Sequence, residues 1–247
     1  MKLRSIYLIF LFCVAASSFA QENRTAETKV ADVLALFPAE TSKDADRLFQ
    51  DLINLDDQGL ELLLSRVVPN GLEQGVAPRF AVSLLTHHAS SKQQKARIEK
   101  AYLKALANAG ANEVKAYFID NLKVIGSNNS INALAELISN EDLMQQAISG
   151  LVSIGTPEAS AALLSALEQS GDAATQARLI KALGHLKYQP ALQAITKRAS
   201  SDNETIRKNA LWSLALIADP GSFGTLTQQA KNVQYKNDPA EATHALV

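Results

Sequence analysis

The sequence repeats itself with a period of about 30 residues, and this repeat constrains the fold more than any other feature. Four segments share the pattern: "DNLKVIGSNNSINAL", "SGLVSIGTPEASAAL", "KALGHLKYQPALQAI" and "WSLALIADPGSFGTL". Each carries an anchor leucine, and the four anchors are Leu122, Leu151, Leu183 and Leu214. An apolar residue follows each anchor after three positions and another after twelve, with Gly or Pro marking a turn between them. The pattern predicts two helices joined by a tight turn in every repeat.

A single hairpin of this kind has apolar residues on more than one side and cannot bury them alone. In the last repeat Ile206, Ala210 and Leu214 fall on one helical face. Such hairpins stack on their neighbours, and small residues just before the anchors let adjacent helices approach closely; these are Gly150, Ala182 and Ser213. We therefore expect an all-α fold, an α-solenoid of antiparallel helix pairs, with regular repeats over residues 111–247.

Residues 21–110 are also expected to be helical, but less regular, forming variant repeats and a capping element. The segment "PNGLEQGVAP" at 69–78 holds two Pro and two Gly and is the strongest loop signal. Alternating runs of β-branched and aromatic residues, which would predict strands, are missing. The expected helices cover about Ala26–Leu36, Ser42–Leu55, Gly59–Val68, Val76–His88, Gln93–Asn108 and Asn112–Ile125.

The N-terminus has the pattern of a secretory signal peptide. Lys2 and Arg4 precede a short apolar run from Ile6 to Val14, and Ala20 offers a small residue for cleavage after it. The alternative is a membrane anchor, but the run is shorter than the roughly 20 residues of a spanning helix. We expect residues 1–20 to be removed and the protein to be exported, to the periplasm or the extracellular space.

Removal of this segment would take away Cys13, the only cysteine of the chain. The mature chain would then have no disulfide, no thiol nucleophile and no cysteine-based metal site. The net charge of −1 gives no reason to expect a nucleic acid or an anionic membrane as partner. We also expect no membrane span after the signal is removed.

The repeats resemble HEAT repeats, including the short type of the phycobilin lyase-like proteins. The resemblance covers about residues 110–230 and is carried by the "LxxIG" and "ALxxL" helix ends and by "DNETIRKNALWSLALIADP". It implies a HEAT/armadillo-like architecture and a scaffold or binding surface. The run "ADRLFQDLINLDDQGLELLLSRVVPNGLEQGVAPRFAVSLLTHHAS" is similar to secreted bacterial HEAT-repeat proteins. Some of these continue into a domain of the 3-keto-disaccharide hydrolase type, no residue of which can be mapped here.

No group of residues in the sequence predicts catalysis, a metal site or a cofactor. The adjacent His87 and His88 point about 100° apart on a helix and are best explained as a polar helix end, as is His185. The acidic pairs Asp56-Asp57 and Glu141-Asp142 lie at expected helix starts, where capping explains them. We interpret three aromatic residues as core or groove edge rather than as a sugar platform: Tyr102, Tyr117 and Phe118. The sequence therefore predicts a non-enzymatic chain.

The remaining candidate is a recognition surface on the second helices of the repeats. The positions two and six residues before the anchors include Lys181, Lys208 and Trp212, the only tryptophan. Trp212 lies about 160° around its helix from Leu214, so it can point away from the apolar stripe. Tryptophan often anchors interfaces, and these three residues form the predicted partner-binding patch. The alternative is that Trp212 fills the seam with the neighbouring repeat.

Two interpretations of function follow. The first is an exported scaffold that binds a protein or peptide partner, or a neighbouring domain of the same polypeptide. The second is the accessory half of a larger carbohydrate-active exported protein, whose catalytic domain would lie elsewhere. An enzyme acting alone, such as a bilin lyase, is disfavoured because no nucleophile or metal site converges.

The C-terminal segment "NDPAEATHALV" predicts the start of one more helix. Asp238 is the expected N-cap, Pro239 the first helical residue, and Leu246 the next anchor, 32 residues after Leu214. We therefore expect the last repeat to be incomplete and the native chain to continue beyond residue 247.

Overall fold

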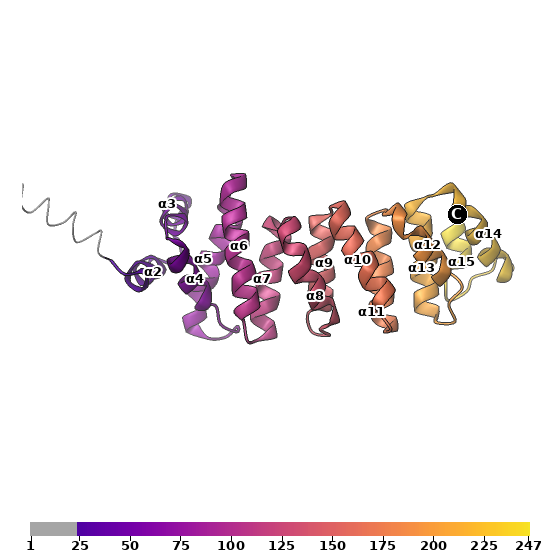
Figure 1. The fold of residues 1–247 in the computed structure, drawn as a ribbon, viewed down its shortest axis with the longest axis horizontal. Helices are drawn as coiled ribbons and strands as arrows, with labels where there is room; N and C mark the ends of the chain where they lie inside the picture. The colour runs from indigo at the N-terminus through magenta and orange to yellow at the C-terminus, as the bar shows by residue number, and fades with distance from the viewer. Residues whose placement is uncertain (1–23) are drawn as a thin grey trace, which may run out of the picture. The chain divides into compact units, whose positions relative to one another are not determined.

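The computed structural model describes residues 24–247, and every regular element within that range is helical. The predicted signal peptide and its cleavage site after Ala20 lie outside the described residues. The chain forms two compact units, the first ending at Ser90 and the second beginning at Ser91. The predicted all-α solenoid of antiparallel helix pairs is confirmed in the second unit, where the helices follow one another in a row (Figure 1).

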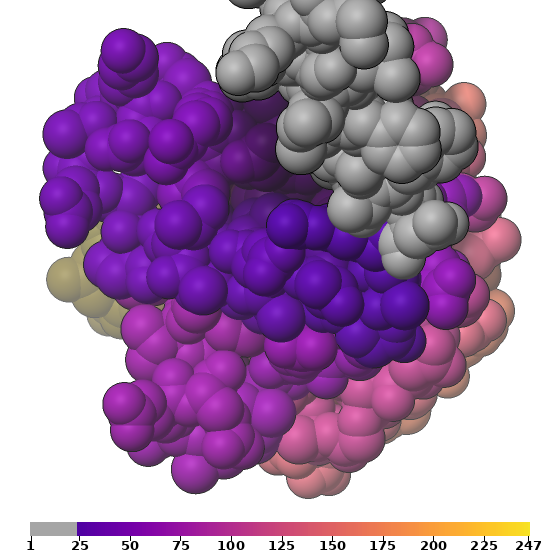
Figure 2. All heavy atoms as spheres, turned by 90° about the vertical axis from the view of Figure 1, so that its left-hand side faces the viewer, coloured from indigo at the N-terminus to yellow at the C-terminus, as the bar shows by residue number. Residues whose placement is uncertain are grey.

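Over residues 24–90, the part of the first unit that the structure describes, there are four α-helices and one short 3-10 helix. These are α2 (Ala26–Leu34), α3 (Ser42–Ile53), α4 (Asp57–Ser65), η1 (Glu73–Gly75) and α5 (Val76–His88). Helix α2 packs against α3, α4 and α5. In the space-filling view its indigo atoms abut the purple atoms of the neighbouring helices (Figure 2). Leu48, Leu52 and Leu63 are fully buried in this core.

Short polar residues cap the first helices of the first unit, and Asp56 is the one that the sequence predicted. The side chains of Thr25, Thr41 and Asp56 accept hydrogen bonds from backbone N–H groups in the first turns of α2, α3 and α4. His87 and His88 form the last turn of α5, where a cation is favoured by the helix dipole. The predicted bounds of α5 coincide with the observed ones, whereas the predicted loop at 69–78 is shorter because η1 and α5 already begin at 73 and 76.

The second unit begins with α6 (Lys92–Asn108) and α7 (Asn112–Ile125) and continues as helix pairs. The remaining α-helices are α8 (Ile131–Glu136), α9 (Met144–Ile154), α10 (Pro157–Gln169), α11 (Ala173–His185), α12 (Leu192–Arg198), α13 (Glu204–Ile217), α14 (Phe223–Asn232) and α15 (Ala242–Leu246). Short 3-10 helices are η2 (Asn128–Ser130), η3 (Leu137–Ser139), η4 (Gln189–Ala191) and η5 (Pro220–Ser222).

The odd-numbered helices α7, α9, α11, α13 and α15 form one layer, in which each packs against the next. Each also packs against the even-numbered helix that precedes it, so every pair forms a hairpin. The four anchor leucines lie in α7, α9, α11 and α13 and are completely buried. The apolar residues twelve positions later are buried in the even-numbered helices; these are Leu134, Leu163, Ile195 and Leu226. The 30-residue register of the sequence is thus the register of the solenoid.

The residues three positions after the anchors follow the expectation less uniformly. Ile125 and Ile217 are buried, whereas Ile154 and Leu186 are half-buried at the ends of their helices. The turns contain the predicted Gly and Pro residues. Gly155 ends α9 in the left-handed conformation with a φ of 64°, and Ala218 ends α13 with a φ of 56°. A non-glycine residue in this region is strained.

The aromatic residues Tyr102 and Phe118 are core residues, as expected. Both are essentially inaccessible to solvent, and their ring centroids lie 5.8 Å apart. Tyr117 is half-buried, and its ring centroid is 5.8 Å from that of Phe118. These contacts join α6 to α7 and leave no open aromatic platform at this place.

A buried carboxylate links α6 to the beginning of the following repeat. Glu99 is only 1% exposed. Its carboxylate accepts hydrogen bonds from the Ser127 backbone N–H at 2.7 Å, from the Ser127 hydroxyl, and from the Ser130 hydroxyl at 2.6 Å. These hydrogen bonds compensate for the cost of burying the carboxylate. The carboxylate in turn provides an acceptor for the polar groups of Ser127 and Ser130 at the start of η2.

Candidate partner-binding surface

Helix α13 presents one buried face and one exposed face. Its N-cap is Asn203, whose side chain accepts a hydrogen bond from the Ile206 N–H. Ile206, Ala210 and Leu214 point into the core, as the sequence predicted. Trp212 and Leu216, one turn apart, are 38% and 37% exposed. Trp212 therefore does not belong to the apolar stripe.

The neighbouring helix α11 carries exposed side chains at equivalent positions. Lys181 and His185 lie two residues before and two residues after the anchor Leu183, as Trp212 and Leu216 do around Leu214, and both are exposed. Since α11 and α13 pack side by side in the same register, these residues share one face of the solenoid. We call the set of Lys181, His185, Lys208, Trp212 and Leu216 the α11–α13 ridge.

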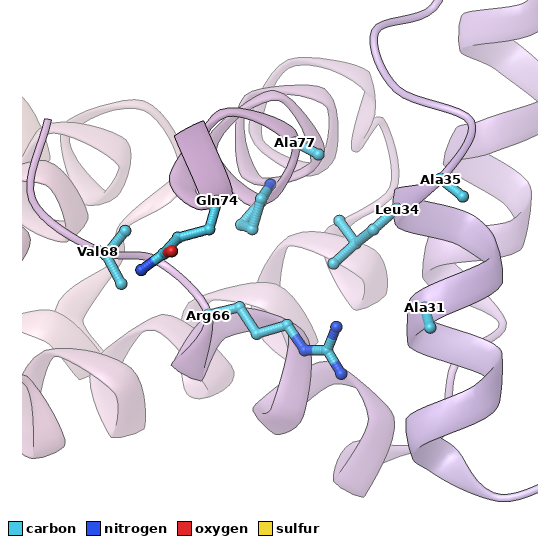
Figure 3. A pocket seen from close by; sticks show the side chains of 8 residues that line it. Ala31, Leu34, Ala35, Arg66, Val68, Gln74 and Ala77 are labelled. Carbon is cyan, nitrogen blue, oxygen red and sulfur yellow. The ribbon is translucent and has the colours of Figure 1, made fainter. Parts of the chain in front are cut away.

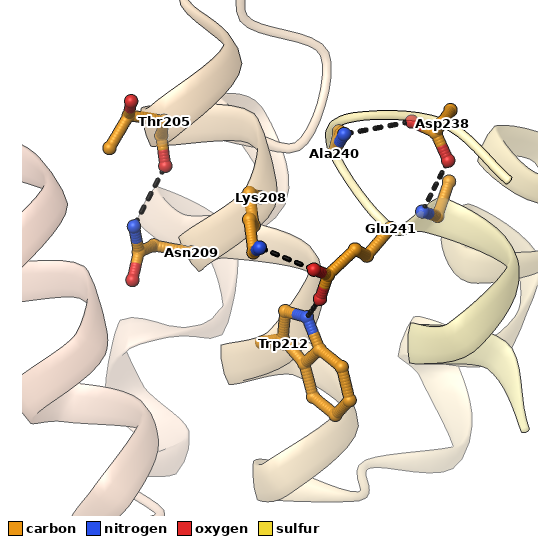
Figure 4. Close-up of polar contacts among 8 residues, drawn as sticks. Thr205, Lys208, Asn209, Trp212, Asp238, Ala240 and Glu241 are labelled. Carbon is orange, nitrogen blue, oxygen red and sulfur yellow. Dashed lines mark hydrogen bonds and ion pairs between the residues drawn. The ribbon is translucent and has the colours of Figure 1, made fainter.

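Two of the three predicted partner-binding residues are joined by a residue that the sequence analysis did not single out. The Glu241 carboxylate accepts a hydrogen bond from the Trp212 indole Nε1–H at 2.8 Å and forms an ion pair with the Lys208 ammonium (Figure 4). These hydrogen bonds, that of Lys208 first and that of Trp212 second, lower the pKa of Glu241. Lys181 takes no part in this contact. The Trp212 indole thus contacts the segment before α15 through its N–H, while the side chain stays 38% exposed.

The backbone around Glu241 differs from the sequence expectation. Pro239 does not begin a helix, because α15 starts only at Ala242. The Asp238 carboxylate instead accepts hydrogen bonds from the N–H groups of Ala240 at 3.0 Å and Ala242 at 2.8 Å (Figure 4). Glu241, with a φ of 56°, stands at the N-cap of α15. The predicted helix start lies three residues too early. The Asp238 side chain closes a turn with Ala240 and Ala242 and does not cap a helix that begins at Pro239. Leu246, the expected anchor, is half-buried, whereas Ala242 and Ala245 are buried.

A repeat-based search could have found Glu241. It lies 33 residues after Lys208, close to one period, so the two residues occupy similar places in adjacent repeats. The expectation of a regular helix from Pro239 hid this relation, because Glu241 would then have been an ordinary first-turn acidic residue.

The ridge contains two ammonium groups, an imidazole, an indole and an aliphatic side chain. One of the ammonium groups, that of Lys208, is paired with Glu241. Among residues 24–247 no cluster of three or more His, Cys, Asp or Glu could hold a metal ion. Within the same residues, no helix is long and apolar enough to cross a membrane. The acidic pairs have structural partners: Asp56 caps α4, and Asp142, in the turn before α9, accepts a hydrogen bond from Asn112.

Comparison with known families supports the repeat assignment. A family model described as HEAT repeats matches residues 160–246, which span α11 to α15 and most of α10. In this part the solenoid is similar to HEAT repeats. The residues that match this family model include the whole α11–α13 ridge and Glu241.

Comparisons with curated proteins and with solved structures give no information about function. No curated protein matches the chain. The chain is similar to a solved structure described as the complex of CpcE and CpcF of phycocyanin lyase from Nostoc sp. PCC7120. The identity is 14% over 91% of this chain and 96% of that chain, with a TM-score of 0.37. A similarity of this size does not bear on function. The suggested link to a carbohydrate-active domain gains no support and stays a prediction.

Proposed function

We propose that this protein is an exported, non-catalytic HEAT-repeat scaffold that binds a protein or peptide partner through the α11–α13 ridge. The observation that carries the proposal is the exposure of Trp212 and Leu216, one turn apart, on a helix whose opposite face is buried. A large indole on a rigid support has little conformational entropy to lose, and tryptophan is enriched at the energetic centres of interfaces.

The Glu241 contact supports a specific chemistry for the partner. Lys208 and Trp212 together hold a carboxylate of the chain itself. Lys181 and His185 lie on the adjacent helix with their side chains exposed. A partner segment with an apolar side chain next to an acidic one would match these groups, the apolar group on Leu216 and the indole face and the carboxylate on Lys181.

The proposal is tested with a double variant, Trp212→Ala with Leu216→Ala, and with Lys181→Ala. A matched control is Lys197→Ala, which removes another exposed lysine, from α12 in the other layer. Each protein is used to capture partners by cross-linking from the compartment where it resides. We expect the ridge variants to lose the captured partner while keeping the cooperative thermal transition of the unmodified chain, and Lys197→Ala to retain it. Capture of the same partner by the double variant would contradict the proposal.

Export has its own test. Cell fractionation followed by N-terminal sequencing should find the mature chain outside the cytoplasm, beginning at Gln21. A chain that keeps Met1 and resides in the cytoplasm would refute this part of the proposal without affecting the ridge.

A further inference from the structure

The first unit contains a cleft that the ridge and the repeat architecture do not explain. Its volume is about 490 Å³, within the range of small-molecule sites. It is bordered by α2, by the end of α4 with the loop that follows, and by η1 with the start of α5 (Figure 3). Its lining residues are Ala31, Leu34, Ala35, Arg66, Val68, Gln74, Ala77 and Pro78.

The cleft walls are mostly apolar and made of small side chains. Three of the lining residues are alanines: Ala31 on α2, Ala35 directly after it and Ala77 on α5. Leu34 points into the space between them (Figure 3). One wall is held in place by Arg79, whose guanidinium donates hydrogen bonds to the Val68 carbonyl at 2.8 and 3.3 Å. The cleft therefore has a defined wall and an interior that favours an aliphatic group.

Among the described residues that line the cleft, Arg66 is the only charged one. It stands at the C-cap of α4, is half-buried, and extends its guanidinium toward α2 (Figure 3). Within residues 24–247 the guanidinium makes no hydrogen bond and no ion pair. Its guanidinium attracts the carboxylate of Glu27 at the start of α2, but this attraction is the least of the causes that lower the pKa of Glu27. An arginine beside an apolar cleft has unused donors in a planar fork that suits a carboxylate.

Gln74 adds a neutral polar group at the opposite border. Its side chain extends beside Val68 (Figure 3) and likewise makes no hydrogen bond within the described residues. The side chains that residues 24–247 contribute to the cleft thus include one cation and one neutral amide. A single cation balances a single negative charge, whereas a phosphate dianion in this apolar setting would remain under-compensated.

We propose that this cleft binds a small aliphatic monocarboxylate, with the carboxylate paired to Arg66 and the alkyl chain lying against Leu34, Ala31 and Ala77. Helix α5 extends the apolar contact, because Val76 and Phe80 lie beside Ala77 on its surface and are both 49% exposed. This site is independent of the proposed partner surface, since every residue that forms it belongs to the first unit.

The test uses decanoate as probe and decanol as its uncharged match, both below their aggregation limits, with the purified protein. Binding is measured by calorimetry and mapped by backbone amide NMR shifts. We expect decanoate to shift amides of α2 and α5 and to bind at least about tenfold more tightly than decanol, because the charge-assisted hydrogen bonds to Arg66 are lost with the alcohol.

Variants then assign the effect to the cleft. Arg66→Gln should weaken decanoate about tenfold and leave decanol unchanged. Ala77→Leu should weaken both probes by filling the space. Arg47→Gln, which removes an exposed arginine of α3 in the same unit, is the control and should change neither.

Three outcomes would overturn the proposal: equal affinity for decanoate and decanol, unchanged binding by Arg66→Gln, or amide shifts confined to the second unit. If Arg66→Gln fails to fold, the comparison of the two probes on the unmodified protein and on Ala77→Leu still decides. A negative result for the cleft does not bear on the proposed partner surface, because that surface is tested by variants of α11 and α13.

Discussion

Helix α13 has two neighbours in its layer and meets them in two different ways. Its contact with α11 is close and dry. Ser213, only 1% exposed, lies directly against Gly184 of α11 and donates a hydrogen bond to the Ile180 carbonyl at 2.9 Å. A Cβ atom placed on Gly184 would lie 2.6 Å from the Ser213 Cβ and 2.8 Å from its Cα. The missing side chain at Gly184 is what lets these two helices approach.

The contact of α13 with the segment before α15 is polar and partly open. Lys208 and Trp212 reach across to the Glu241 carboxylate, and all three side chains retain solvent access. The first seam depends on shape and therefore resists changes of pH and salt. The second depends on charge and hydrogen bonding and therefore responds to both. The same helix thus joins a rigid part of the solenoid to an adjustable one.

The largest effect should come from Gly184→Ala, which breaks the dry seam. The added Cβ meets Ser213 Cβ and Cα, and a side-chain rotation cannot move these atoms. We expect the free energy of unfolding to fall by about 1–3 kcal/mol, even though alanine has the higher helix propensity. Chemical denaturation measures this.

The matched control is Gly224→Ala in α14, where nothing lies within 4 Å of the new Cβ. It should leave stability unchanged or raise it by up to about 1 kcal/mol. Equal destabilisation by both variants would show that the close approach at Gly184 is not what matters.

A smaller effect, of opposite sign, is expected at the end of α13. Ala218 has the left-handed conformation that Gly155 has at the equivalent end of α9. Ala218→Gly should raise the free energy of unfolding by up to about 1 kcal/mol, because the strain of the Cβ is relieved. Gly155→Ala, the reciprocal change, should lower it by a similar amount. Thermal melts of both variants check the pair, and a destabilising Ala218→Gly would argue against strain at this position.

Ser213→Ala separates the polar part of the dry seam from its shape. It removes the hydrogen bond to Ile180 but keeps the Cβ against Gly184. We expect a loss of about 0.5–1.5 kcal/mol, less than for Gly184→Ala. A larger loss than for Gly184→Ala would reverse our ranking of shape over hydrogen bonding.

The subtlest prediction concerns the polar seam and pH. Because the pKa of Glu241 is lowered in the folded protein, its ionised form stabilises the contact above the ordinary pKa of glutamate, and this contribution disappears as the pH falls through the lowered value. Trp212 is the only tryptophan and donates to this carboxylate, so its fluorescence reports the titration. We expect an acidic transition with a midpoint below the ordinary glutamate pKa.

Glu241→Gln should abolish that transition with little change in thermal stability, since the pair is open to solvent. A midpoint at or above the ordinary value, or an unchanged transition in Glu241→Gln, would contradict the assignment.

The sequence predicted the dry part of the solenoid better than the polar part. Periodic apolar residues such as Leu183 and Leu214 are stable only in the core between helices, so their burial follows from their spacing in the sequence. Ser213 was recognised as a small residue near a seam, but its partner Gly184 was not, because the pairing depends on how two helices rotate against each other. The cleft beside Arg66 could not be predicted, since an arginine at a helix end gives no signal of what surrounds it.

Glu99 has a consequence for the order in which the protein is built. The carboxylate lies 28 residues ahead of Ser127 and 31 ahead of Ser130, whose groups it receives. A ribosome therefore releases the acceptor before the donors exist. When the turn at Ser127 is synthesised, its hydrogen-bond acceptor on α6 is already part of the chain. The joint between α6 and the next repeat thus has its acceptor on the part of the chain that is made first.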